Sequence, residues 1–252
     1  MLLTFSRLPG ADFVINPYIG CGFGCKYCYA KFMAKFVAGK HGLSEDKKAL
    51  QQQWGKWVVP KIKEVKNFEN ELLKMANKLA GRTILLSSVT DPYQPVEAKY
   101  KLTRKILRIW AKVAPKNANL EILTRSALIL RDIDLFAKIK NLTIGMSISI
   151  LPKNKFRKIE PYSPLIDVRI KTLHELKQAG LNVYAFVAPV WPSEVDKLIE
   201  TLERLRKLGI PVQYIELLNK ISRRQFNVDF SEEELETLQK IAGSVEAFLI
   251  QH

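Results

Sequence analysis

The stretch Asn16-Pro-Tyr-Ile-Gly-Cys-Gly-Phe-Gly-Cys-Lys-Tyr-Cys-Tyr29 holds all three cysteines of this 252-residue chain. Cys21, Cys25 and Cys28 follow the spacing C-x3-C-x2-C, with an aromatic residue directly before the last cysteine. Three thiolates can hold three irons of a cubane [4Fe–4S] cluster, which leaves the fourth iron open to a small molecule. The spacing therefore predicts an iron–sulfur site with one free coordination position.

Three other uses of the cysteines compete with this interpretation. A structural zinc site needs four ligands, and the nearest histidine, His41, lies thirteen residues beyond Cys28. A disulfide framework fits poorly with an odd cysteine count and with an N-terminus that lacks the order of a secretion signal. Buried inert thiols would leave the clustering unexplained. The neighbouring glycines, in contrast, suit a cluster loop, because they let backbone amides approach the sulfurs.

The composition bounds the class of protein. Hydrophobic residues make up 47% of the chain and charged residues 26%, which is typical of a soluble globular protein. The longest apolar run, 184–191, is far too short to span a bilayer. We expect one domain over residues 1–252 with a basic insertion at about 39–66, a monomeric state, a cytoplasmic location and no membrane association.

The formal net charge of +15 is concentrated in one part of the chain. Residues 1–159 hold 29 Lys and Arg against 11 Asp and Glu, whereas residues 160–252 hold 11 against 14. A one-sided basic field favours polyanions such as DNA or RNA, although a lysine-rich solubilising surface would look the same. Within the insertion, Trp54 and Trp57 alternate with lysines, so they either stack bases or anchor the loop.

Strand-like and helix-like segments alternate after the cysteines, which predicts a parallel sheet. We expect helices at about 128–139 and, at the end of the chain, from Ser231 through Phe248 and Leu249. Six βα units are too few for a closed eight-stranded barrel and predict an α/β partial (β/α)6 barrel, with functional groups at the C-terminal ends of its strands. The six expected strands are 13–15, 83–87, 120–124, 142–150, 182–187 and 212–217.

Further motifs accompany the cysteines. They are residues 87–97, residues 123–134, Glu160-Pro161, Arg169, Ala179-Gly180 and Val187-Ala-Pro189. Together they resemble the radical SAM superfamily, in its spore photoproduct lyase-like branch, which is also labelled DNA-repair-photolyase-like. The resemblance implies the same TIM-like partial barrel and S-adenosylmethionine (SAM) chelated to the open iron. It also implies reductive cleavage of SAM to a 5′-deoxyadenosyl radical that abstracts hydrogen, with an external one-electron donor such as ferredoxin or flavodoxin.

The resemblance also implies roles for four residues near the cysteines. Tyr27 would pack against adenine. Thr90 and Asp91 would bind the amino group of the methionine moiety, since a carboxylate suits an ammonium. Arg125 would hold the SAM carboxylate. In the alternative, Asp91 with the following proline is only a turn, and Arg125 pairs with Asp132 or Asp134.

Two later strands supply the remaining cofactor candidates. By the same resemblance, Ser147 and Ser149 would reach the ribose, and Ala188 and Val190 would line the adenine pocket. The two serines also fit as small inward residues of a crowded barrel, because a strand-end position is only a pointer to function.

The chain departs from the spore lyase pattern in one respect. That lyase uses a further cysteine as hydrogen donor, and this chain has no fourth cysteine. We therefore expect a different substrate or outcome, with Tyr29 or Tyr93 as the hydrogen donor. The sequence predicts a radical SAM enzyme that acts on a nucleic acid. The alternatives are the same chemistry on a peptide or small metabolite, or a non-catalytic iron–sulfur protein that binds nucleic acid.

Overall fold

One curved sheet forms the centre of the molecule in the computed structural model, which describes residues 1–251. Its strand order is β1-β2-β5-β6-β7-β8-β9-β10, and every pairing is parallel except that of β1 with β2. The strands are β1 Leu3–Phe5, β2 Phe13–Ile15, β5 Thr83–Leu86, β6 Asn119–Thr124, β7 Leu142–Ile150, β8 Asn182–Val190, β9 Val212–Leu217 and β10 Phe248–Ile250.

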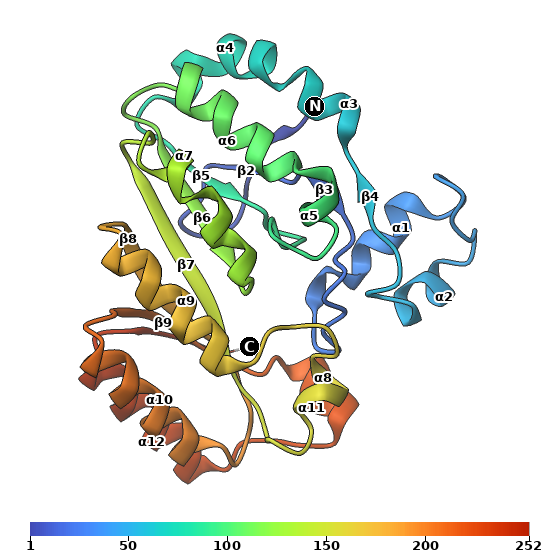
Figure 1. Ribbon diagram of the computed structural model, residues 1–252. Helices are drawn as coiled ribbons and strands as arrows, with labels where there is room; N and C mark the ends of the chain where they lie inside the picture. Colours follow the sequence, from blue (N-terminus) through green and yellow to red (C-terminus); the bar gives the residue numbers. More distant parts are fainter. Residues whose placement is uncertain (252) are drawn as a thin grey trace.

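Helices cover the outer face of this sheet (Figure 1). α6 shows why they do so: Leu102, Ile106 and Trp110 recur at helical spacing and are buried, which gives the helix one apolar stripe for the sheet. The helices of this layer are α4 Phe68–Leu79, α6 Leu102–Val113, α7 Ile133–Phe136, α9 Ile166–Gln178, α10 Val195–Lys207 and α12 Glu232–Ser244.

The long strands β7 and β8 form the middle of the sheet. On β7, Ile144, Met146 and Ile148 are fully buried, and alternation places the residues between them on the opposite face. There Gly145 lies beneath the ring of Tyr184, its register partner on β8: a Cβ at Gly145 would lie 2.4 Å from that ring. Glycine at this position therefore allows an aromatic side chain to cross the strand.

The α/β partial barrel expected from the sequence is confirmed, and all six expected strands are present. Two further strands of this central sheet were missed. β1 adds an antiparallel edge, and β10 occupies residues that we had assigned to the last helix. That helix starts at the expected capping box of Ser231 and Glu234 but ends at Ser244. Glu246 then takes a left-handed conformation with φ 54°, and Phe248–Ile250 pairs with β9.

The helix expected at about 128–139 is also different. Residues Ala127–Asp132 form a 3-10 turn, η2, and the α-helical part, α7, ends at Phe136. The side chain of Asp132 explains the irregular turn, because Arg104 of α6 binds it from outside the segment and the neighbouring Arg131 binds it from within. Tertiary ion pairs here decide the local conformation.

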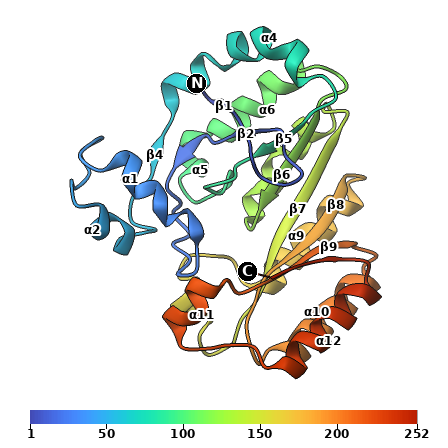
Figure 2. The ribbon, with the colours of Figure 1, turned by 180° about the vertical axis from the view of Figure 1, so that it is seen from behind.

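Residues 39–66 lie beside the sheet together with the cysteine loop (Figure 2). Asp46 caps α2 through its side chain, and Trp54 and Trp57 pack with Cys21 and Cys25 in a separate small core. The elements here are β3 Tyr18–Ile19, η1 Tyr29–Met33, α1 Ala34–Val37, α2 Lys47–Gln52, β4 Val59–Pro60 and α3 Ile62–Lys66. Among the described residues, no helix is long and apolar enough to cross a membrane.

Candidate functional site

The cysteine loop runs from the end of β3 to the start of η1. Cys21 and Cys25 are buried, Cys28 is half-buried, and all three are free thiols. Burial raises the pKa of each thiol, that of Cys28 to about 11. A buried thiol becomes a thiolate readily only next to positive charge, which a bound metal supplies.

The loop is held by close contact with the turn at residues 54–57. Gly55 has φ +100°, and a Cβ there would lie 2.6 Å from the Cα of Gly24. Trp57 donates its indole N–H to the carbonyl oxygen of Leu50 at 2.9 Å, and its ring meets Trp54 edge to face. Both tryptophans are buried, so of the two interpretations of their role, the loop anchor is confirmed and base stacking is wrong.

Arg125 connects the end of β6 to the cysteine loop. Its Nη1 lies 3.1 Å from the Sγ of Cys25, 2.8 Å from the hydroxyl of Tyr27 and 2.9 Å from Oε1 of Glu160. Tyr27 also hydrogen-bonds Glu160. The alternative pairing of Arg125 with Asp132 or Asp134 is wrong, since those carboxylates are bound by Arg104.

Glu160 is the centre of a fully buried ion-pair network. Its second oxygen accepts from Arg169, whose Nη1 also contacts the carbonyl of Ser147 and, at 3.3 Å, the hydroxyl of Ser149. Burial opposes ionisation of Glu160, but the charges of Arg169 and Arg125 outweigh it and lower its pKa to about 2. The carboxylate is therefore charged, and it fixes both guanidinium groups behind the cysteine loop.

Asp91 and Thr90 lie at the end of β5, next to this network. Asp91 accepts hydrogen bonds from the hydroxyl of Thr124 at 2.7 Å, from N–H of Tyr93 at 2.8 Å and from N–H of Arg125 at 3.0 Å. Burial raises the pKa of this carboxyl, and the hydrogen bonds counteract part of the rise. In this arrangement Asp91 positions the backbone of Arg125.

Thr90 takes part in a second set of contacts, on the cysteine loop itself. Its hydroxyl donates to the carbonyl of Gly20 at 2.6 Å. Gln94 donates its amide to that carbonyl and to Thr90, and its Oε1 accepts from N–H of Gly22 at 2.7 Å. Gln94 thus ties the first turn of the cysteine loop to the segment after β5.

The candidates on β7 and β8 have different surroundings. Ser147 lies 3.5 Å from Nη2 of Arg125 and donates to the carbonyl of Ala188 at 3.4 Å, so it belongs to the Arg125 site. Ser149 is fully buried against Arg169, and Val190 packs into the main hydrophobic core. Of these four residues, Ser147 contacts Arg125 directly, and Ala188 is joined to it through Ser147.

The two tyrosine candidates do not lie together. Tyr29 follows Cys28, is 61% exposed, and donates its hydroxyl to the carbonyl of Ser88 after β5. Tyr93 is fully buried in the main core, with the guanidinium of Arg131 5.9 Å from its ring centre. The geometry therefore favours Tyr29 over Tyr93 as a group that a substrate can reach.

Sequence reasoning did not assign a role to several residues that the fold brings to this site. Glu160 and Arg169 were named as parts of a motif, but neither they nor Gln94 were assigned a function from the sequence. No local signal marked the two charged residues, because Glu160 and Arg169 lie among other charged residues, as exposed side chains ordinarily do. Ser87 is a further case: it has φ 76°, and its buried hydroxyl has no hydrogen-bond partner among the described residues.

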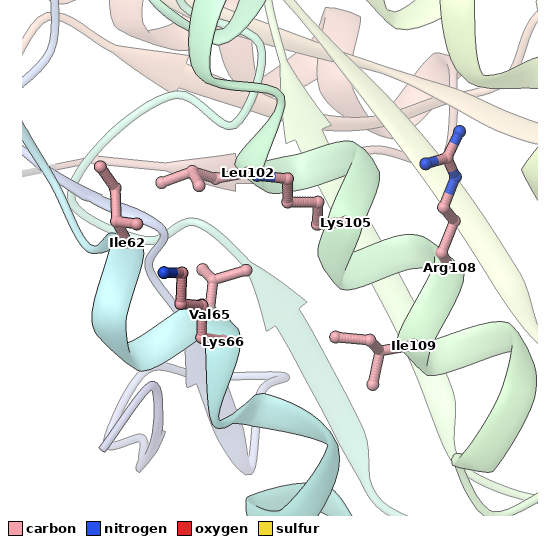
Figure 3. Close-up of a pocket in the computed structure, with 7 residues that line it drawn as sticks. All are labelled: Ile62, Val65, Lys66, Leu102, Lys105, Arg108 and Ile109. Atoms are coloured by element: carbon pink, nitrogen blue, oxygen red, sulfur yellow. The ribbon is translucent and has the colours of Figure 1, made fainter.

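A separate shallow pocket of about 280 Å³ lies between α3 and α6 (Figure 3). Its floor is apolar and its rim carries Lys66, Lys105 and Arg108. The other lining residues are Ile62, Val65, Leu102 and Ile109. None of the cofactor candidates lines it, so it is distinct from the cysteine site.

The site combines a partial barrel with three thiols in one loop, two of them buried and one half-buried. Comparisons with known proteins identify the class of protein in which this combination occurs. The family profile described as the Radical SAM superfamily matches residues 15–205. The chain therefore belongs to the radical SAM superfamily, a superfamily of enzymes.

Similar sequences are known from other organisms. The chain is 40% identical to an uncharacterized protein of Methanocaldococcus jannaschii, covering 88% of this chain and 76% of that protein. It is 29% identical to an uncharacterized protein of Acidianus two-tailed virus, covering 86% and 70%.

Two kinds of solved structure share the fold. Spore photoproduct lyase with a dinucleoside spore photoproduct matches with TM-score 0.66 and 13% identity, covering 99% of this chain and 79% of that one. In another lyase structure, with AdoMet and the dinucleoside bound, the chain spans 58% of the lyase chain. Streptococcus suis SuiB bound to S-adenosylmethionine matches with TM-score 0.57 and 14% identity, covering 94% and 46%.

Proposed function

We propose that this chain binds a [4Fe–4S] cluster through Cys21, Cys25 and Cys28, together with SAM, and acts on a nucleic acid. The observation that carries the cluster assignment is the buried, disulfide-free group of three thiols with the Arg125 guanidinium 3.1 Å from Cys25 Sγ. Among the described residues, no three metal-ligating side chains converge as the ligands of a single ion do. A cubane cluster differs in this respect, because each thiolate binds its own iron.

The residues around the thiols fit the two groups. Arg125 is placed to share a hydrogen bond with a thiolate and to hold a carboxylate, and Ser147 lies beside it. When bound, the cluster and SAM would supply the 5′-deoxyadenosyl radical, with a ferredoxin- or flavodoxin-type donor providing the electron. The protein's own part is to position these groups and to exclude water with the packing around Trp54 and Trp57.

The nucleic-acid target is supported by where the cations lie. The pocket between α3 and α6 has three of them on its rim. A hollow of about 540 Å³ lined by Lys220, Arg223 and Arg224 opens on α11, Lys220–Phe226. The first turn of α11 contacts the cysteine loop, since Ser222 hydrogen-bonds the carbonyl of Tyr27. The basic hollow on α11 therefore adjoins the cysteine loop, as binding of a polyanionic substrate requires, and the pocket between α3 and α6 is a second, separate basic surface.

The test is anaerobic reconstitution followed by two assays. We expect about four irons per chain and release of 5′-deoxyadenosine from SAM under dithionite, and the affinity for oligonucleotides should fall steeply with salt. If the loaded protein never cleaves SAM while a control enzyme does, the catalytic proposal is wrong and a structural cluster remains. Normal cleavage with no salt-dependent binding of DNA or RNA would instead point to a peptide or small metabolite.

A further inference from the structure

Three aromatic side chains lie exposed in a row directly after the last cysteine. We call Tyr29, Phe32 and Phe36 the aromatic row; they are 61%, 38% and 52% exposed. The rings of Tyr29 and Phe32 are stacked with centres 6.4 Å apart, and those of Phe32 and Phe36 meet edge to face at 6.3 Å. Large exposed apolar groups in contact with one another are unusual on a monomer and mark a binding surface.

The row lies on the outward side of the short helical segment formed by η1 and α1. The inward side consists of Ala30, Ala34 and Val37, which pack against Leu50 and the tryptophans of the small core. The outward side of such a segment is ordinarily polar. Here it carries aromatic rings at positions i, i+3 and i+7, so the packing of the fold does not account for them.

The charges around the row are positive. Residues 17–44 contain four lysines and neither Asp nor Glu. The Nζ of Lys35 lies 5.4 Å from the ring centre of Phe32 and 4.9 Å from that of Phe36. The nearby acidic group is Glu216 of β9, which contributes to the raised pKa of Tyr29. Exposed rings interleaved with cations are the combination that binds single-stranded nucleic acid, because bases stack on the rings and phosphates meet the lysines.

The row also has a fixed position relative to the cysteine loop. Tyr29 directly follows Cys28, and its hydroxyl is bound to the carbonyl of Ser88 on the loop after β5. The first ring is therefore held across the strand ends that carry Thr90 and Asp91, and the other two rings lead away from them. A strand stacked along the row would reach the cysteine loop at its inner end.

We propose that the aromatic row is the binding platform for an unpaired, single-stranded segment of the nucleic-acid substrate. This proposal narrows the nucleic-acid substrate to unpaired strands. It rests on the proposed function only in taking the bound strand to be the substrate of the enzyme. The stacking itself can be measured without SAM. A double helix keeps its base faces covered, so the platform should select unpaired strands.

The test compares matched variants of the cluster-loaded protein. Phe32→Ala with Phe36→Ala should weaken binding of a 2-aminopurine-labelled single-stranded oligonucleotide by roughly 5- to 160-fold for each stacked base that is lost, because stacking of one base on a ring contributes a factor in this range. The double substitution should abolish the quenching of 2-aminopurine fluorescence that stacking causes, and it should leave the affinity for a duplex nearly unchanged. The control is Phe5→Ala, which removes a more exposed ring, 74% exposed, from the edge strand β1.

Lys35→Gln separates charge from stacking. We expect the slope of log affinity against log salt to become shallower by about 0.7, the contribution of one single-strand phosphate contact, with quenching retained. If the double variant proves unstable, Phe36→Leu tests the same loss of a ring while it keeps an apolar side chain.

Two results would overturn the proposal. One is single-strand affinity and quenching in the double variant equal to those of the unmodified protein. The other is a double variant that binds oligonucleotides as before and cleaves SAM with dithionite but not with flavodoxin or ferredoxin. That result would make the row a docking site for the protein reductant. Failure of the proposed function is distinguishable, since it shows as no SAM cleavage under dithionite in any variant.

Discussion

Arg125 Nη1 and Cys25 Sγ lie 3.1 Å apart although one hundred residues separate them in the sequence. The contact joins the end of strand β6 to the cysteine loop, and Glu160 and Arg169 hold it from behind. Because the four side chains share one buried network, substitution of any of them should alter the geometry of the cysteine loop.

The first prediction concerns Cys25→Ala. A cubane that loses one of its three thiolates should not form stably. The reconstituted protein should therefore lack the broad absorbance of Cys-ligated clusters at about 410 nm, and it should hold little iron or sulfide. Ser163→Ala is the matched control, because its hydroxyl lies 3.7 Å from the same sulfur and is no ligand. Full iron loading of Cys25→Ala would show that the ligands are misassigned.

The second prediction concerns Glu160→Gln. The change leaves Arg125 and Arg169 close together without their shared carboxylate, and breaking a buried pair in this way costs about 3–5 kcal/mol. Urea unfolding measures the loss. Asp134→Asn removes an exposed partner of Arg104 and should cost much less, because solvent screens a surface ion pair. Equal effects of the two substitutions would contradict the importance of the buried network.

The third prediction is the pH dependence of that stability. The pKa of Glu160 is lowered from 4.5 to about 2, so its ionisation stabilises the fold above about pH 4.5, and this contribution disappears as the pH falls toward 2. The free energy of unfolding of the unmodified protein should therefore exceed that of Glu160→Gln by a margin that narrows by about 3 kcal/mol between pH 5 and pH 2. A margin that stays constant over this range would mean that Glu160 is not ionised in the folded state.

The fourth prediction compares two glycines of the insertion. Gly55→Ala forces a Cβ into the backbone of Gly24, whereas Gly42, with φ +72°, has no atom within 4 Å of such a Cβ. Both substitutions pay for the left-handed conformation, about 1–2 kcal/mol, and Gly55→Ala adds about 1–3 kcal/mol of overpacking. Gly55→Ala should have a lower midpoint of thermal unfolding and a lower iron content than Gly42→Ala. Equal values for the two variants would show that the cysteine loop does not depend on this contact.

The fifth prediction concerns Trp57→Phe. The indole N–H bonds the carbonyl of Leu50 in a buried place, so its removal should cost about 1–3 kcal/mol of stability. Oligonucleotide affinity, measured by fluorescence anisotropy, should stay the same in whatever protein remains folded. A selective loss of affinity without loss of stability would restore the base-stacking role that burial argues against.

The fold was largely predictable because its signals are local. Alternating apolar strands and amphipathic helices repeat along the chain, and six of the seven parallel strands follow from that pattern. β10 did not, because Phe248 and Leu249 also fit the helical spacing of the preceding segment, and only pairing with β9 makes them a strand. Segment η2 differs for a similar reason, since the long-range ion pair between Arg104 and Asp132 holds its turn.

The ligands of the candidate site were predictable from the sequence, whereas the residues that hold those ligands in place were less so. The three cysteines stand out by spacing alone, and Arg125 by its place after a strand. The roles of Glu160, Arg169 and Gln94 depend on contacts across 9 to 133 residues, which no local pattern encodes. The same holds for aromatic residues: Trp54 and Trp57 suggested a surface for bases, yet the structure buries them and exposes Phe32 and Phe36.

By itself, the sequence determined the thiol spacing, the order of strands and helices, and the excess of positive charge, because each is a property of neighbouring residues. Only the tertiary structure decided which aromatic rings face solvent, which carboxylate neutralises which guanidinium, and which segments surround the cysteine loop. Burial and ion pairing depend on the distance between atoms in space, and in this chain those atoms come from strands and loops far apart in sequence.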